Sequence, residues 1–174
     1  PAVREAIEGA VLNIPNELAS LDFDDWTSAS AIRMILEIFG HHPDWEEARQ
    51  FFSRVTEWLA IVWDRDRRHS RDEGRRNYEL EHEALRAVAR FLLKLPIEEA
   101  QRICQPLIDG VDVNTRKAAD FLQDLIVAAD GGADDCFWDL WQAIVDKAVN
   151  APWIGRLDSD RPYEESFINL VFLG

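Results

Sequence analysis

The feature that most limits what this chain can fold into is an amphipathic helical pattern that runs nearly from end to end, interrupted by Pro, Gly and Asp. Over residues 44–63 and 77–95, large apolar side chains recur at intervals of three and four, which places them on one face of a helix. Strand-like alternation of apolar and polar residues is nearly absent. The pattern therefore predicts an all-α fold.

Punctuation residues predict where these helices begin and end. Pro96 separates two of them, because the residue before a proline is pushed out of helical conformation. Asn114 suits a helix N-cap, and Asp134 and Asp135 suit the first turn of another helix. We expect about eight antiparallel helices joined by turns near 40–43, 96, 110–114 and 130–133, the helices covering 2–13, 26–39, 44–63, 77–95, 97–111, 114–129, a segment from 134 and 162–173. For 162–173, periodicity alone does not separate helix from strand.

Length and composition are typical of one folded domain covering residues 1–174. Apolar residues make up 47% of the chain, which supplies a core. The helical pattern is already present at Pro1, and an apolar run closes the chain at 167–173. Since free termini are usually polar, we expect a fragment of a larger protein; the alternative is a complete small protein whose last segment packs on its own core.

Charge and cysteine usage limit the partners and the compartment. The formal net charge is 19 − 33 = −14, which disfavours nucleic acid and anionic membrane surfaces as partners. Cys104 and Cys136 form no C-x-x-C motif and fit buried thiols in a reducing compartment. No apolar run approaches the roughly 18 residues that span a bilayer. These features favour a cytoplasmic protein that does not contact a membrane.

Candidate chemical motifs have ordinary structural explanations. Glu79 and His82 form an E-x-x-H pair, but a di-iron bundle needs a second pair, which the sequence lacks. His41 and His42 fit the C-terminal turn of a helix. No phosphate-binding loop and no nucleophile elbow occurs. We therefore expect no catalytic residues, no metal, no cofactor and no enzyme activity in this chain.

The densest cluster of arginines lies in residues 64–76. This segment has six Arg and four acids, so it carries +2 and the rest of the chain carries −16. It is either an exposed arm that binds phosphate or an acidic protein surface, or a polar segment neutralised by its own Arg–acid pairs. Trp58 and Trp63, like Trp138, either widen the core or form an exposed contact. The candidate partner-binding residues are Arg65, Arg67, Arg68, Arg71, Arg75, Arg76, Trp58 and Trp63.

One segment resembles a known repeat family. From Ile103 to Ala119, Pro106 lies within a first helix, an Asp-containing turn follows, and Arg116 opens a second helix. This arrangement resembles the linking region of a HEAT repeat, and Val3-Arg4-Glu5-Ala6 is similar to the start of such a second helix. The resemblance implies a right-handed stack of helix pairs that acts as a protein-binding or spacer module. An irregular helical bundle is the alternative.

The sequence thus favours a non-catalytic scaffold or protein-interaction module of a larger cytoplasmic protein. Its partner would be another protein or other domains of the same polypeptide. Two alternatives stay open. The chain could be the helical accessory region of a multidomain enzyme or NTPase whose active site lies elsewhere, or a small-molecule-binding bundle with a pocket among its Trp and Phe side chains.

Overall fold

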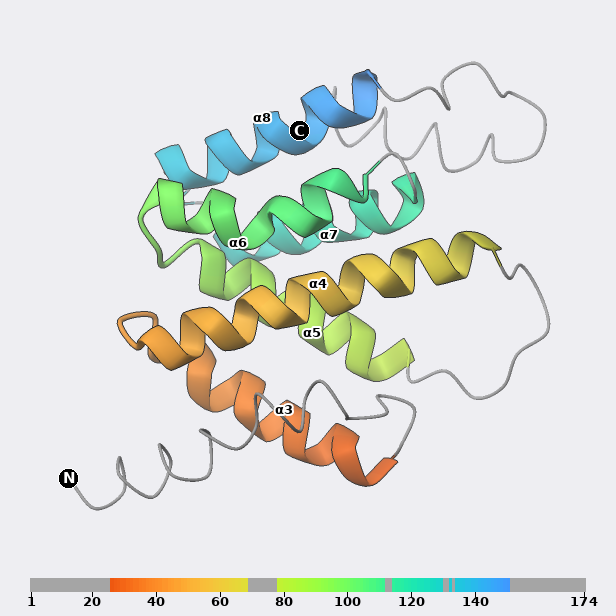
Figure 1. Ribbon diagram of the computed structural model, residues 1–174. Helices are drawn as coiled ribbons and strands as arrows, with labels where there is room; N and C mark the ends of the chain where they lie inside the picture. The colour runs from red at the N-terminus through yellow and green to blue at the C-terminus, as the bar shows by residue number, and fades with distance from the viewer. Residues whose placement is uncertain (1–25, 69–77, 112–113, 130–131, 133, 151–174) are drawn as a thin grey trace.

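The computed structural model describes residues 26–68, 78–111, 114–129, 132 and 134–150. Within these ranges the regular structure consists entirely of α-helices, which confirms the all-α prediction (Figure 1). The expected helices at 2–13 and 162–173 lie outside the described residues. The six described helices are α3 Trp26–Gly40, α4 Glu46–Arg68, α5 Tyr78–Leu92, α6 Ile97–Asp109, α7 Thr115–Ala129 and α8 Asp135–Val149.

The predicted caps are present. The side-chain oxygen of Asn114 accepts a hydrogen bond from the Lys117 backbone N–H at 3.3 Å, at the start of α7. Asp134 is the N-cap of α8 and accepts from the Phe137 N–H at 3.0 Å. Each cap satisfies a backbone donor that the first turn of a helix leaves unpaired. The turns fall where Pro, Asn and Asp predicted them.

Helix α4 is longer than the sequence pattern indicated. The prediction ended it at residue 63, the end of the apolar stripe, whereas the helix continues to Arg68. Residues 64–68 are Asp and Arg with no Pro or Gly among them, and Arg is a good helix former. The apolar stripe therefore ends before the helix does.

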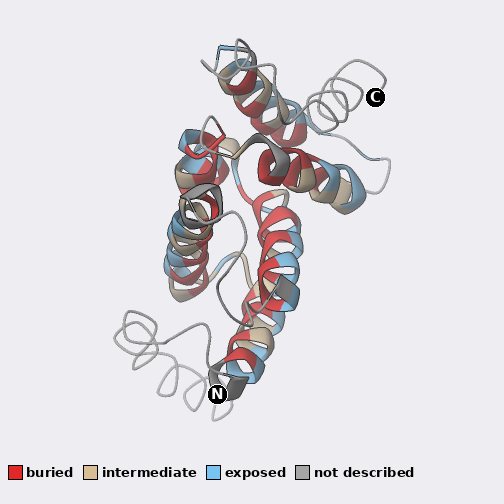
Figure 2. Cartoon of the chain, turned by 90° about the vertical axis from the view of Figure 1, so that its right-hand side faces the viewer, coloured by how far each residue is buried: buried red, intermediate tan, exposed pale blue. Residues whose placement is uncertain are grey.

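The helices alternate between two layers. Helices α3, α5 and α7 pack side by side in one layer, and α4, α6 and α8 pack side by side in the other. Contacts of α4 with α5 and of α7 with α8 join the layers. Figure 2 shows the buried residues along the faces that the layers turn toward each other. The core is therefore a continuous apolar seam between two rows of helices.

Large aromatic side chains fill this seam. The rings of Phe52 on α4 and Phe91 on α5 stack with centroids 4.0 Å apart, and Phe39 packs edge-on against Phe51 at 5.3 Å. Phe39, Phe52 and Phe91 are fully buried. Burying a Phe side chain stabilises a fold by about 1.5–3 kcal/mol relative to leaving it exposed. These stacked and edge-on aromatic pairs form part of the packed core.

Polar contacts join neighbouring helices within each layer. In the first layer, Arg33 on α3 pairs with Glu79 and Glu83 on α5. Glu81 on α5 pairs with Lys117 on α7, and both side chains are buried. In the second layer, the buried Thr56 hydroxyl on α4 lies 2.7 Å from the Ile103 carbonyl oxygen on α6, to which it donates. Because each contact needs one specific alignment, together they fix how the helices are placed along one another.

Candidate interaction surface

Trp63 lies in the core and not on the surface, so its prediction as a partner-binding residue is wrong. Its side chain is fully buried, and its indole nitrogen has no hydrogen-bond partner among the described residues. Val62, which the apolar spacing over residues 44–63 predicts on the buried face at i+3 from Leu59, is only half-buried. Trp63 follows Leu59 by four residues and continues the buried face one turn further. The alternative that Trp63 widens the core is the correct one.

Trp58 lies at the edge of the core, beside an exposed apolar residue that the sequence analysis missed. Trp58 is half-buried and packs against the core cluster. Ile61, one turn further along α4, is 59% exposed. Arg54 is exposed one turn before Trp58. The signal for Ile61 was present, because it falls outside the buried stripe and at i+3 from Trp58.

The surface formed by these residues continues along α4. Helical register places positions 65 and 68 on the same side of the helix as 54, 58 and 61. We call this set, Arg54, Trp58, Ile61, Arg65 and Arg68, the α4 surface. Two carboxylates, on Glu57 and Asp64, lie along one edge of it. The α4 surface thus combines apolar and positively charged residues on one face of one helix.

The predicted arginines divide between described and undescribed parts of the chain. Arg65, Arg67 and Arg68 belong to the last turn of α4, while Arg71, Arg75 and Arg76 lie outside the described residues. Helix α4 has 23 residues and its layer neighbour α6 has 13. At 1.5 Å per residue their lengths are about 34 Å and about 20 Å. The arginine end of α4 consequently projects beyond α6 (Figure 1).

A second run of basic residues is used inside the fold. Arg86, Arg90 and Lys94 follow one another at intervals of four, with no acid among residues 84–97. The Arg86 guanidinium lies 3.5 Å from Asp124 on α7, and Lys94 Nζ donates to the Gly40 carbonyl at the end of α3 at 2.7 Å. Two of these three charges therefore hold neighbouring helices together. Arg90 is exposed on α5.

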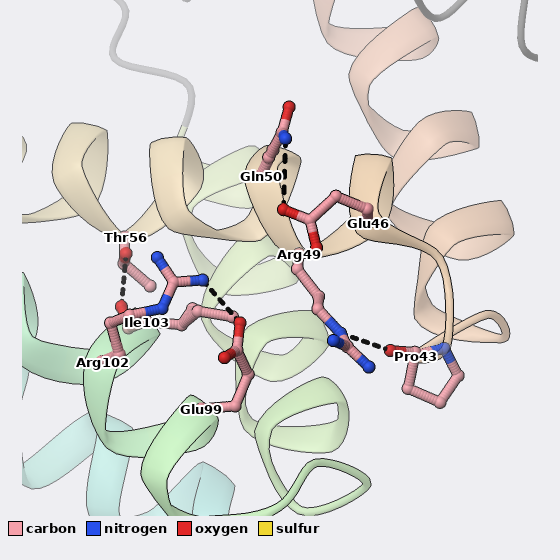
Figure 3. A network of polar contacts seen from close by, with 8 residues as sticks. All are labelled: Pro43, Glu46, Arg49, Gln50, Thr56, Glu99, Arg102 and Ile103. Atoms are coloured by element: carbon pink, nitrogen blue, oxygen red, sulfur yellow. Dashed lines mark hydrogen bonds and ion pairs between the residues drawn. The ribbon is translucent and has the colours of Figure 1, made fainter.

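The N-terminal half of α4 is occupied by a network of internal polar contacts (Figure 3). Arg49 Nε donates to the Pro43 carbonyl at 2.9 Å, and Gln50 donates to Glu46 at 3.2 Å. On α6, the hydrogen bond from Arg102 holds the pKa of Glu99 below its ordinary value, and the charge of Arg49 acts in the same direction. Arg49, Gln50 and Glu46 thus have partners inside the fold. The exposed apolar residue of α4, Ile61, lies in its C-terminal half.

Two of the residues considered for metal binding, Glu79 and His42, have other contacts. The Glu79 carboxylate binds Arg33, and the His42 ring stacks on Trp45 with centroids 3.9 Å apart. In the part of the chain that the structure describes, no three His, Cys, Asp or Glu side chains gather as a metal site would require. Burial raises the pKa of the thiols of Cys104 and Cys136, which opposes formation of the nucleophilic thiolate.

Exposed apolar residues occur at a few other places. Met34 on α3 and Val127 on α7 are each more than 60% exposed, and Trp138 on α8 is 54% exposed. None of the described helices is long and apolar enough to cross a membrane.

Comparison with known proteins gives no match to any family model, curated protein or solved structure.

Proposed function

We propose that this chain is a protein-interaction module without catalytic activity of its own, and that a partner protein binds the α4 surface. The observation that carries the proposal is the position of Ile61. It is 59% exposed, beside the half-buried Trp58, on a helix whose last turn carries three arginines. Aromatic residues and Arg are enriched in the parts of interfaces that contribute most to binding.

The charge of the surface favours an acidic partner even though the chain as a whole is acidic. Residues 65–68 carry three Arg and one Asp, against a net charge of −14 for the chain. At physiological ionic strength, charges more than about 8 Å away are largely screened. The field that an approaching segment meets at the end of α4 is therefore set mainly by residues 64–68, which carry three Arg and two Asp, and less by the distant carboxylates.

We also propose that the helix pairs form a HEAT-like stack. The alternation of successive helices between two layers, each helix packing against the next but one, supports this arrangement. In such a stack each repeat contacts mainly its neighbours, so that long helical faces stay open to partners. A stack of this kind suits a scaffold that belongs to a larger cytoplasmic protein.

A capture experiment with two matched variants tests the proposed function. Ile61→Asp and Val127→Asp each place a carboxylate at an exposed apolar position, on α4 and on α7 respectively. Immobilised wild-type chain and the Val127→Asp variant should retain the same set of cellular proteins, and Ile61→Asp should lose members of that set. Equal capture by all three proteins would refute binding at the α4 surface.

A further inference from the structure

The outward face of α8 carries a tryptophan between two carboxylates. Trp138 is 54% exposed near the start of the helix. Asp135 lies three residues before Trp138 and four before Asp139, spacings that bring side chains together on the surface of a helix. Both aspartates are exposed, and residues 135–146 contain three Asp and no Lys or Arg. We call Asp135, Trp138 and Asp139 the α8 patch.

The carboxylates of the α8 patch differ from the other aspartates of this helix in having no partner inside the fold. Asp134 is the N-cap of α8, and Asp146 accepts a hydrogen bond from Gln142 at 2.6 Å. Within the described part of the chain, neither Asp135 nor Asp139 takes part in an ion pair or a side-chain hydrogen bond. The helix N-terminus contributes about half a positive charge, which Asp134 offsets, so the α8 patch stays negative.

Packing beneath the α8 patch holds the indole ring in place. The adjacent Phe137 is buried, and the Trp138 ring meets it edge-on with centroids 5.0 Å apart. A ring that is already held on one side loses little further freedom when a partner covers its other side. The face of an indole ring attracts cations, most often the guanidinium of Arg. The ring and the two carboxylates therefore favour the same kind of ligand group.

We propose that the α8 patch binds an arginine-containing segment of a second protein. One guanidinium of that segment lies over the Trp138 indole and pairs with the carboxylate of Asp135 or Asp139. Arg suits this position better than Lys, because its planar group stacks on aromatic rings and pairs with a carboxylate through two parallel hydrogen bonds. This contact is additional to the α4 surface and does not depend on it.

The charge of the α8 patch disfavours other occupants. The same patch of a second copy would bring carboxylates against carboxylates, and like charges across an interface are costly. A nucleic acid backbone and an anionic membrane carry the same sign of charge as the patch. A wholly apolar segment would bury the two carboxylates without partners. A basic segment satisfies the ring and the carboxylates together.

A nuclear magnetic resonance titration of the isotope-labelled full chain tests this binding. The probes are short capped peptides of equal length, one of arginine, one of lysine and one of glutamate. At low salt the oligo-arginine peptide should shift the amide signals of α8 and the Trp138 indole signal in a saturable manner. The oligo-lysine peptide should bind more weakly and the oligo-glutamate peptide should cause no shift. In 1 M salt, where the Debye length falls to about 3 Å, binding should decline.

Variants with a matched control locate the site. Trp138→Ala should weaken oligo-arginine binding roughly threefold, because it removes the ring. The double variant Asp135→Asn with Asp139→Asn should weaken it roughly fivefold, because it removes both ion pairs. The control, Glu37→Gln with Glu57→Gln, also removes two exposed carboxylates, on α3 and α4, and should bind as the wild type does. Thermal melts verify that each variant stays folded.

Four results would overturn the inference: no saturable shift at α8, equal affinity for the arginine and lysine peptides, equal weakening by the two double variants, or self-association of the wild-type chain that Trp138→Ala abolishes. The last result would make a second copy the occupant. Failure here is separate from failure of the proposed function, because Ile61→Asp, which changes only the α4 surface, should bind the oligo-arginine peptide as the wild type does.

Discussion

The indole ring of Trp63 lies so close to Gly110 that a Cβ atom added at position 110 would come within 3.2 Å of the ring carbon Cε3. The same Cβ would also lie 3.3 Å from the Pro106 carbonyl oxygen and 3.4 Å from that of Leu107. Trp63 of α4 thus packs directly on the backbone at the end of α6. Beyond this contact α4 continues to Arg68.

The first prediction follows from this contact. Gly110→Ala should destabilise the fold by about 1–3 kcal/mol, because a rigid ring and two carbonyls must shift to admit the methyl group. Gly132→Ala is the matched control, since among the described residues its Cβ would meet the Ala129 carbonyl oxygen alone, at an ordinary 3.5 Å. Chemical denaturation of both variants measures the difference. Equal midpoints for the two would show that Trp63 is free to move.

The second prediction concerns the buried ion pair between Glu81 and Lys117. Lys117→Met should destabilise the fold by about 3–5 kcal/mol, because it leaves the Glu81 carboxylate buried without its cation. The double variant Glu81→Leu with Lys117→Met should recover most of this loss, since two apolar side chains can replace the pair. A denaturation series on the four proteins gives the coupling energy. A double variant as unstable as the single one would mean that the pair itself is what stabilises the α5–α7 contact.

The third prediction concerns the thiols. Burial raises the pKa of Cys136 to about 11, and the charges of Asp134 and Asp139 add to this rise. Burial is also the main cause that raises the pKa of Cys104. Native protein at pH 8 should therefore react slowly with a disulfide reagent, and denatured protein should react at once at both thiols. Rapid reaction of the native chain would show that α6 and α8 open readily.

The same shifts have a consequence for stability at alkaline pH. A thiol pKa that is higher in the folded than in the unfolded chain favours folding while the thiol is protonated. This contribution is complete below the unfolded pKa of about 8.5 and is lost as pH rises toward the folded value of about 11 for Cys136. The melting temperature should fall over this range, and less steeply in a variant carrying Cys104→Ala and Cys136→Ala.

The fold was largely predictable because its signals are local. Helix spacing, Pro96, Asn114 and Asp134 each act within a few residues, and all of them mark element boundaries in the structure. The position of Trp63 was not predictable, because a change of one residue in helical register moves a side chain between the core and its edge. Packing within the core, including the close approach to Gly110, holds Trp63 in its buried position.

The candidate surface was predictable in part. The arginine cluster is visible in the sequence. The sequence does not show that α4 carries Arg65, Arg67 and Arg68 beyond the end of α6. Whether a basic residue can bind a partner protein also depends on contacts with residues far away along the chain. Arg86 and Lys94 are engaged by Asp124 and the Gly40 carbonyl, which lie 38 and 54 residues away along the chain. The exposure of Ile61 likewise depends on which helices pack around α4.

The fourth prediction separates surface charge from structure. Charge reversal by Arg65→Glu and Arg68→Glu should weaken binding at the α4 surface, most strongly at low salt, because it removes the local attraction for an acidic partner. The thermal melt should change little, as for most surface substitutions. Arg90→Glu, an exposed charge reversal on α5, is the control. A lowered melting temperature with unaltered binding would assign these arginines a structural role.

Site-specific photo-crosslinking tests the central claim, that the α4 surface is a protein contact, most directly. A photoreactive amino acid replaces Ile61 in one protein and Val127 in another, two positions of similar exposure on different helices. Irradiation in cell extract should yield discrete covalent adducts to an acidic protein from position 61, and few from position 127. Adducts of equal number and identity from both positions, or none from position 61, would contradict the account.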